Sequence, residues 1–312
     1  MKLVRAVERY LDLRKATGCG ARSIAIVLHR FVKTIGPDRQ IDSIQRGEVR
    51  AFLDRNGSPP AYWRCEHSAL RGFYNFAVGH GLVPYVPLPM ILPRLGEPFR
   101  PYVYTHAEID RLIKTTDEIA TNECLLEPPT FRTLIWLLYG AGLRVSEALN
   151  LTLADVDLVE NLLIIRQTKF YKARIVPMGP SLTRIVLEYK MSYGTRFGTD
   201  PARPLLISKR GKRLMHQCVD NAFVRLRSKA GISRSDGARY QPRLHDMRHS
   251  FAVRRLTMWY QQGADVQALL PVLATYLGHA SIVSTQVYLS MTPELLAQAS
   301  LRFAVYAGGV SS

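Results

Sequence analysis

The chain has 312 residues, 47% of them hydrophobic, and a formal net charge of +17. A chain of this length and apolar content can bury one large core or two smaller ones, which excludes global disorder. Its four cysteines are scattered without a C-x-x-C pair, which argues against a zinc site or a disulfide framework. No apolar run approaches the roughly 18–20 residues of a membrane span. The N-terminus lacks the apolar core of a signal peptide, so a cytoplasmic location is expected.

The excess of basic residues predicts a polyanionic partner. Nucleic acid is the first candidate, and a basic ribosomal or membrane-surface protein is the alternative. Residues 1–100 hold 16 Lys and Arg against 8 Asp and Glu, and residues 101–312 hold 26 against 17. Because both parts are basic, both are expected to contact the anion.

The N-terminal part is predicted to be helical. Apolar residues recur at helical spacing in three segments, 2–17, 21–34 and 42–54. Ser58, followed by two prolines, starts a fourth helix that runs to about Gly79. We therefore expect a helical domain over 1–81. Three of its arginines are candidate DNA contacts, although a solvated helical bundle is the alternative: Arg22, Arg64 and Arg71.

Residues 82–102 contain six prolines and are predicted to be an extended inter-domain linker, because proline lacks a backbone donor and disfavours helix in the preceding residue. A second domain then covers 103–312. It opens with a helix after the capping-box spacing at Thr105, and an apolar helix over 131–139 follows. Further helices are expected around 215–230, 246–261, 265–277, 281–289 and 293–303.

Strand-like runs interrupt the helices of the second domain. Residues 162–165 and 175–177 predict a β-hairpin whose tip carries Lys169, Lys172 and Arg174. A third short strand is expected over 205–208, ahead of a basic turn that contains Arg210 and Lys212. The fold class is therefore mainly α with a small antiparallel β-sheet. The basic residues of the hairpin and the turn are candidate DNA contacts.

The stretch from 242 to 291 gathers His245, Arg248, His279 and Tyr288 in one C-terminal run. A guanidinium, two imidazoles and a phenol supply charge for phosphate oxygens, proton transfer and a nucleophile. Each of these residues alone is more typical of a structural role.

At this point the sequence resembles the tyrosine recombinases of the phage integrase family. The matching stretches, in order, are A-G-L-R-V-S-E (141–147), Q-T-K-F-Y-K-A-R-I-V-P (167–177), H-D-M-R-H (245–249), L-G-H-A-S (277–281) and T-Q-V-Y-L (285–289). The resemblance implies a helical core-binding domain followed by a mixed α/β catalytic domain. It assigns catalytic roles to Arg144, Lys169, His245, Arg248, His279 and Tyr288, with Glu147 as an organiser of the helix after Arg144.

The resemblance implies a reaction without metal, cofactor or ATP. Tyr288 attacks the scissile phosphate, which leaves a 3′-phosphotyrosyl bond and a free 5′-OH. Arg144, Arg248 and His279 stabilise the phosphate oxygens, and His245 is the candidate base. Lys169 is the candidate acid for the leaving oxygen, with Lys172 as its rival. His249, His106 and Tyr171 remain structural or DNA-contacting candidates.

The implied partners are double-stranded DNA with paired recognition sites and three further copies of the chain, which act through a Holliday junction. Sister recombinases are possible partners, and the helix over 293–303 is expected to dock onto a neighbouring protomer. Two departures from the family pattern stand out, Met247 in place of Leu and a 31-residue interval between Arg248 and His279. The long interval is similar to that of recombinases from transposons and other mobile elements.

Three alternatives remain open from the sequence. One is a non-catalytic accessory protein of the same fold, and another is a relaxing enzyme like the type IB topoisomerases. The third is a basic RNA- or ribosome-binding protein.

Overall fold

The computed structural model describes residues 1–18, 22–57, 59–95, 101–119, 126–166, 173–238, 240–279, 283–286 and 288. The chain divides into two compact units, Met1–Pro98 and a second that contains most of the chain from Phe99 onward. Within the described residues, no helix combines the length and the apolar character that crossing a membrane requires.

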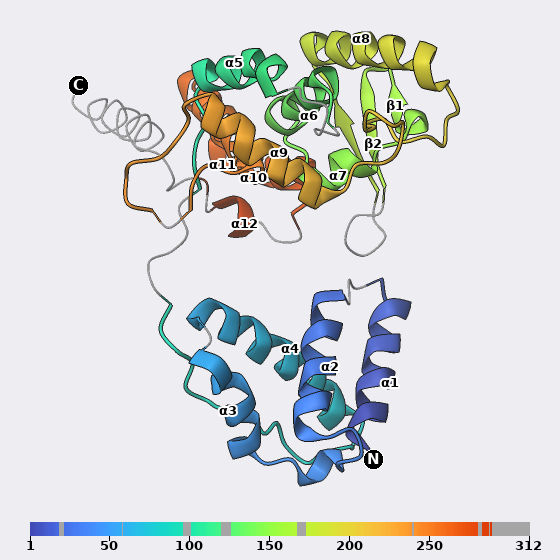
Figure 1. The fold of residues 1–312 in the computed structure, drawn as a ribbon. Coiled ribbons are helices and arrows are strands. Elements are labelled where there is room, and N and C mark those ends of the chain that lie inside the picture. Colours follow the sequence, from blue (N-terminus) through green and yellow to red (C-terminus); the bar gives the residue numbers. More distant parts are fainter. Residues whose placement is uncertain are drawn as a thin grey trace, which may run out of the picture. The chain divides into compact units, whose positions relative to one another are not determined.

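The described residues of the first unit contain four α-helices (Figure 1). They are α1 (Leu3–Ala16), α2 (Arg22–Ile35), α3 (Arg46–Asp54) and α4 (Pro60–Gly79). Pro60 lies at the first position of α4, where its fixed φ suits a helix start, and Pro59 is the N-cap. Ser58, the predicted capping residue, lies outside the described residues. The predicted third helix is shorter than expected, because Ile41–Ser43 forms a separate 3₁₀ turn.

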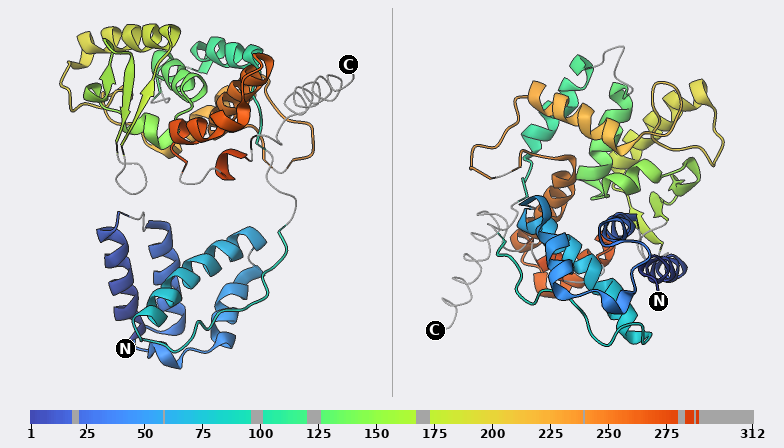
Figure 2. Two further views of the ribbon diagram at one scale, coloured as in Figure 1. Left: turned by 180° about the vertical axis from the view of Figure 1, so that it is seen from behind. Right: turned by 60° about the horizontal axis from the view of Figure 1, so that its bottom comes forward.

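The α-helices of the first unit pack around one aromatic core. Phe31 lies edge-on to Phe52 at a ring distance of 5.0 Å, and Phe73 and Tyr74 complete the buried cluster. Figure 2 shows α1, α2 and α4 packed against one another. The first part of the expected linker belongs to this unit, since Leu88 is buried in the same core.

The second unit combines helices with a small sheet. Its elements are α5 (His106–Thr115), α6 (Pro128–Gly140), α7 (Val145–Asn150), β1 (Val156–Asp157), β2 (Leu162–Ile165), β3 (Arg174–Pro177), α8 (Pro180–Phe197), α9 (His216–Lys229), α10 (Leu244–Gln261), α11 (Val266–Leu277) and α12 (Val283–Gln286). The sheet is antiparallel in the order β1-β2-β3, which confirms the predicted hairpin. The capping box at Thr105 is also confirmed, because Glu108 N donates to Thr105 Oγ1 at 3.2 Å and Thr105 N donates to Glu108 Oε2 at 2.9 Å.

The packing of the second unit explains how distant motifs meet. The apolar helix α6 lies against both α8 and α10, and α10 lies against α11 (Figure 1). The C-terminal half of α11 also contacts β3, so the hairpin and the end of α11 become neighbours. The starts of α7 and α10 and the end of α11 are thereby brought to one region.

The expected strand over 205–208 is wrong. Leu205 N donates to Leu151 O at 2.8 Å, and Ser208 N donates to Lys212 O at 2.8 Å. The run is buried, but its backbone pairs with neighbouring segments through isolated bridges, and Ile207 also bonds to the side chains of Tyr189 and Thr130. The sequence patterns also gave no sign of α8 and β1. The expected helix over 293–303 lies outside the described residues.

Candidate active site

Three consecutive carbonyl groups at the end of α11 each accept a hydrogen bond from a different arginine. The pairs are Arg174 Nε to Tyr276 O (2.9 Å), Arg248 Nη2 to Leu277 O (2.5 Å) and Arg144 Nη2 to Gly278 O (2.9 Å). We call these carbonyls of residues 276–278 the carbonyl turn. Carbonyls at a helix C-terminus carry partial negative charge, which suits them to hold cations. The helix ends here because Gly278 adopts a left-handed φ of 66°.

The carboxylate of Glu147 binds two of the same arginines. Its oxygens accept from Arg174 Nη1 and Nη2, both at 2.8 Å, and from Arg144 Nη1 at 2.7 Å. Arg248 Nη1 lies 3.6 Å away. Burial would raise the pKa of Glu147, but the hydrogen bonds from Arg174 and Arg144 outweigh it and hold the pKa at about 2. One negative charge is therefore held among three guanidiniums at neutral pH.

Arg248 is fully buried, with 1% of its surface exposed. Besides its bond to the carbonyl turn, its Nη1 donates to Gly142 O at 2.8 Å. Gly142 has a left-handed φ of 64°, just beyond the end of α6. Burial, together with the charge of Arg144, lowers the pKa of Arg248 to about 10, which still leaves the guanidinium charged at neutral pH.

His279 directly follows the carbonyl turn and is fixed by Thr285 on α12. Its Nδ1 lies 2.8 Å from Thr285 Oγ1, a buried hydroxyl. With that hydroxyl donating to Nδ1, the ring proton lies on Nε2, which becomes a hydrogen-bond donor. Burial and the charge of Arg248 lower the pKa of His279 to about 4, so the imidazole is neutral at pH 7.

Tyr288 is buried against two histidine rings, with 2% of its surface exposed. Its ring centroid lies 6.0 Å from that of His279 and 5.4 Å from that of His249. Burial raises the pKa of Tyr288, and the charge of Arg248 only partly opposes that effect. The phenol is protonated at neutral pH, so its use as a nucleophile requires a base.

His245 is a candidate base, and the ring of His249 lies beside both His245 and Tyr288. His245 lies in the first turn of α10, a helix that starts two residues earlier than predicted, and its ring centroid is 4.9 Å from that of His249. His245 is exposed, yet partial desolvation and the charge of Arg248 lower its pKa below the ordinary value. The imidazole is therefore in its proton-accepting form at neutral pH.

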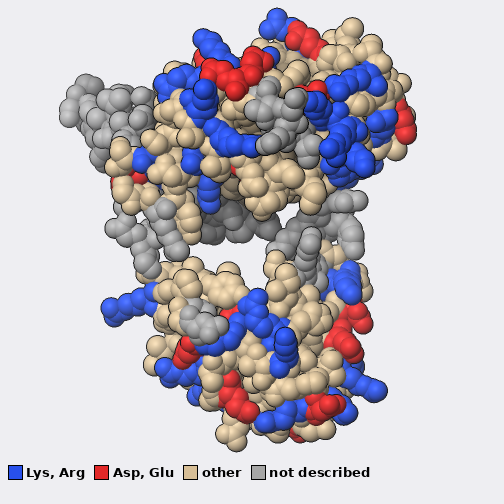
Figure 3. Space-filling model, viewed as in Figure 1, with Lys and Arg blue, Asp and Glu red and all other residues tan. Residues whose placement is uncertain are grey.

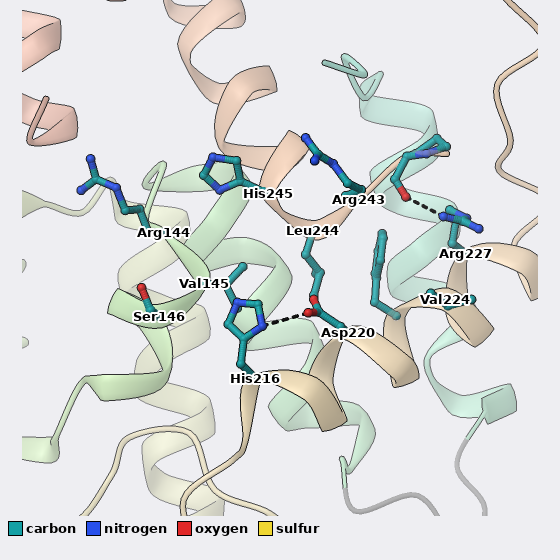
Figure 4. A pocket seen from close by; sticks show the side chains of 12 residues that line it. Arg144, Val145, Ser146, His216, Asp220, Val224, Arg227, Arg243, Leu244 and His245 are labelled. Atoms are coloured by element: carbon teal, nitrogen blue, oxygen red, sulfur yellow. Dashed lines mark hydrogen bonds and ion pairs between the residues drawn. The ribbon is translucent and has the colours of Figure 1, made fainter. Parts of the chain in front are cut away.

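A cavity of about 470 Å³ opens beside these groups (Figure 4). Arg144 and His245 lie along one edge of it, at the starts of α7 and α10. The opposite wall is formed by α9, where His216 Nδ1 lies 2.8 Å from Asp220 Oδ2. The cavity gives a ligand access to the side of the site that carries Arg144 and His245.

The structure thus gathers most of the residues that the sequence singled out, namely Arg144, Glu147, His245, Arg248, His279 and Tyr288. Lys169 and Lys172 lie outside the described residues, as does the side chain of Arg22. Arg71, Arg210 and Lys212 are exposed, and Arg64 is half-buried. The described residues contain no cluster of three or more His, Cys, Asp or Glu that could hold a metal ion.

Arg174 differs from its expected place at the hairpin tip. It pairs with Ile165 at the start of β3, and its side chain turns inward to Glu147. Sequence patterns assigned no catalytic role to Thr285 or His249, although both lie within matching stretches, T-Q-V-Y-L (285–289) and H-D-M-R-H (245–249). The structure adds that the Thr285 hydroxyl lies 2.8 Å from His279 Nδ1 and that the His249 ring lies 5.4 Å from the ring of Tyr288.

We expect Gly278→Ala to disturb the carbonyl turn. The left-handed φ costs a residue with a Cβ about 1–2 kcal/mol, and the new Cβ would lie 2.9 Å from Arg174 Nη1. The expected result is a lower thermal unfolding midpoint together with at least a tenfold slower reaction with DNA. Gly231→Ala is the matched control, because Gly231 has a φ of 63° but nothing within 4 Å of the added Cβ. Equal effects of the two substitutions would contradict the importance of the Arg174 contact.

Guanidiniums, neutral imidazoles and a buried phenol in one largely helical unit define a site suited to phosphodiester chemistry. Comparison with known proteins agrees with a site for phosphodiester chemistry. The sequence profile of the phage integrase family matches residues 103–294. The integrase/recombinase homologue y4rE of Sinorhizobium fredii (strain NBRC 101917 / NGR234) is 34% identical over 296 residues, covering 95% of this chain and 94% of its own.

Solved structures share the fold. The Tn1549 transposon integrase in complex with transposon right end DNA has a TM-score of 0.69 at 16% identity, covering 98% of this chain and 100% of its own. A lambda integrase tetramer bound to a Holliday junction has a TM-score of 0.63 at 17% identity, and the match covers 92% of this chain and 77% of the lambda integrase chain. The chain belongs to the phage integrase family and is a tyrosine recombinase, an enzyme that transfers DNA strands.

Proposed function

We propose that this chain is a site-specific DNA recombinase whose nucleophile is Tyr288. The observation that carries the proposal is the contact of the buried Tyr288 ring with His279, which directly follows the carbonyl turn that binds Arg144 and Arg248. This arrangement puts a hydroxyl, a neutral hydrogen-bond donor and two permanent cations around one position. A phosphodiester needs these groups when its oxygens gain charge in the transition state.

The proposed reaction assigns each side chain one task. Arg144 and Arg248 hold the two non-bridging oxygens, and His279 Nε2 donates a further hydrogen bond to one of them. His245 accepts the proton of the Tyr288 hydroxyl as the phenolic oxygen bonds to phosphorus. The bond between phosphorus and the 5′-oxygen breaks, and Lys169 protonates that oxygen. A 3′-phosphotyrosyl ester and a free 5′-OH result.

The covalent ester makes the reaction reversible without an external energy source. The 5′-OH of another strand can attack the phosphotyrosyl bond, which restores the phosphodiester and releases the tyrosine. The two guanidiniums supply the positive charge that a metal ion supplies in other phosphoryl transfers. We therefore propose a metal- and ATP-independent exchange.

We propose that DNA contacts both units. The helical unit over 1–81 is the proposed DNA-clasping domain, and the unit after the linker is the proposed catalytic domain. Basic side chains on both units support this, and Figure 3 shows Lys and Arg on the drawn face of each. The exposed Arg71, Arg210 and Lys212 are candidate phosphate contacts. Arg64 is a further candidate, and Arg22 and Lys172 are proposed on the sequence alone.

The biological setting is proposed from the relatives. The DNA-bound Tn1549 integrase and the lambda integrase tetramer on a Holliday junction support paired DNA sites and a tetramer for this chain. The long interval between Arg248 and His279 favours a mobile element as its origin. We place the reaction in the cytoplasm, with sister recombinases as further partners.

Covalent capture tests the proposal and finds the DNA site in the same experiment. The purified chain is incubated with sheared genomic DNA of its source organism, the reaction is stopped in detergent, and protein-linked fragments are precipitated and sequenced. We expect captured fragments with blocked 3′ ends and free 5′ ends that share a common sequence. Tyr288→Phe, which removes only the hydroxyl, should capture none.

Capture by Tyr288→Phe, or linkage to 5′ ends, would show that another residue is the nucleophile. Fragments without a common sequence, together with relaxation of any supercoiled plasmid, would instead indicate a topoisomerase-like relaxer. No capture by the wild-type chain would indicate an accessory protein of the same fold.

A further inference from the structure

Arg174 is a nearly buried cation beside the site that the proposed reaction does not use. Its guanidinium forms two parallel hydrogen bonds to Glu147, both 2.8 Å long, and its Nε donates to Tyr276 O at 2.9 Å. Only 11% of the side chain is exposed. These three bonds use Nε and both Nη groups of Arg174, and each of them goes to a group inside the protein.

The Arg174 side chain also packs on the residue that shapes the carbonyl turn. A Cβ placed on Gly278 would lie 2.9 Å from Arg174 Nη1 and 3.3 Å from its Cδ. Arg174 therefore covers Gly278, whose carbonyl binds Arg144 and whose next residue is His279. A shift of Arg174 would therefore loosen its bonds to Tyr276 O and Glu147 together.

The place of Arg174 in the chain gives it a second connection. It is the first residue of β3 and pairs with Ile165, the last residue of β2, so it stands at the foot of the loop that carries Lys169. Through Glu147 the same side chain reaches α7, and through Tyr276 O it reaches the end of α11. Arg174 thus connects β3, α7 and the end of α11, and a proposed catalytic residue lies next to each of these elements in the sequence.

We propose that Arg174 is a positioning residue for strand transfer. It fixes Glu147, the carbonyl turn and the foot of the Lys169 loop in one arrangement, and it does not bind DNA. The inference rests on the proposed function, since it concerns the groups that act on the scissile phosphate. An arginine is required because a lysine ammonium cannot form the two parallel bonds and the third bond to Tyr276 O in one geometry. Displacements of about 1 Å at such a site cost about 10²-fold in rate.

The test compares Arg174→Lys with the wild-type chain on a captured DNA site. Two quantities are measured, the single-turnover rate of covalent adduct formation at saturating DNA and the salt dependence of DNA affinity. We expect the rate to fall about 10²-fold. The slope of log affinity against log salt should stay unchanged, whereas loss of one phosphate contact would reduce it by about 1. Thermal unfolding of both proteins shows that the variant is folded.

Arg184→Lys is the matched control, since Arg184 lies on α8 of the same unit with 75% of its side chain exposed. It should change neither the rate nor the salt slope. If Arg174→Lys does not fold, Arg174→Gln, which keeps a planar donor group, replaces it. A reduced salt slope, or a rate within threefold of wild type, would overturn the inference and leave the proposed function intact. Absence of adducts from the wild-type chain would overturn both.

Discussion

Arg248→Ala is expected to abolish covalent capture of DNA and to lower the free energy of unfolding by about 3–5 kcal/mol. The wild-type side chain is buried, and it donates to the carbonyls of Gly142 and Leu277. Alanine leaves both carbonyls without that donor, Glu147 with one fewer neighbouring cation, and a cavity where the side chain was. Removing one transition-state donor alone costs about 10²–10³-fold in rate.

Chemical denaturation and single-turnover capture measure the two effects of Arg248→Ala separately. Arg254→Ala on the same helix is the control. Arg254 is exposed and its guanidinium lies 4.6 Å from the Tyr139 ring centroid, a contact that contributes about 0.5–1 kcal/mol. Arg248→Lys keeps the positive charge but cannot form the paired hydrogen bonds of a planar guanidinium. It should therefore recover part of the stability and little of the activity. Wild-type capture by Arg248→Ala would show that this guanidinium does not hold the phosphate.

Glu147→Gln is expected to lower the free energy of unfolding by about 3 kcal/mol at neutral pH. The carboxylate has its pKa held at about 2, because the hydrogen bonds from Arg174 and Arg144 outweigh the opposing effect of burial. In the unfolded chain the pKa returns to the ordinary value of about 4.3. A carboxyl group whose pKa is lowered by folding stabilises the folded state at pH values above its pKa in the unfolded chain. That stability is lost as the pH falls through the folded value.

The pH dependence makes the Glu147 prediction specific. The difference in unfolding free energy between wild type and Glu147→Gln should be constant above about pH 5 and shrink between about pH 5 and pH 2. Denaturant titrations across this range measure it. Glu188→Gln is the control, since Glu188 is exposed and its contact with Arg184 is 3.8 Å long. A difference that does not vary with pH would mean that the charge of Glu147 is not what stabilises the site.

Local signals were sufficient for most helices and for the hairpin. The first unit's helices follow apolar stripes that continue for several turns, and helix starts such as Pro60 depend on neighbouring residues alone. Two segments were predicted wrongly or not at all. α8 begins at Pro180 and buries Leu182, Val186 and Tyr189 at helical spacing, a local signal that the predicted elements did not include. The apolar run at 205–208 is buried as a strand would be, but short apolar runs do not reveal where their backbone bonds go.

By itself, the sequence determined which chemical groups are available to this protein, because the type of each side chain and its order along the chain do not depend on folding. It placed two arginines, two histidines and a tyrosine in the order of a known family. Only the tertiary structure decided how these groups are held. The bond from Arg144 to Gly278 joins residues 134 positions apart, and Arg174 turns inward because packing of β3 against α11 brings Glu147 within reach. Such contacts depend on how helices and strands pack, and no residue-by-residue pattern encodes that packing.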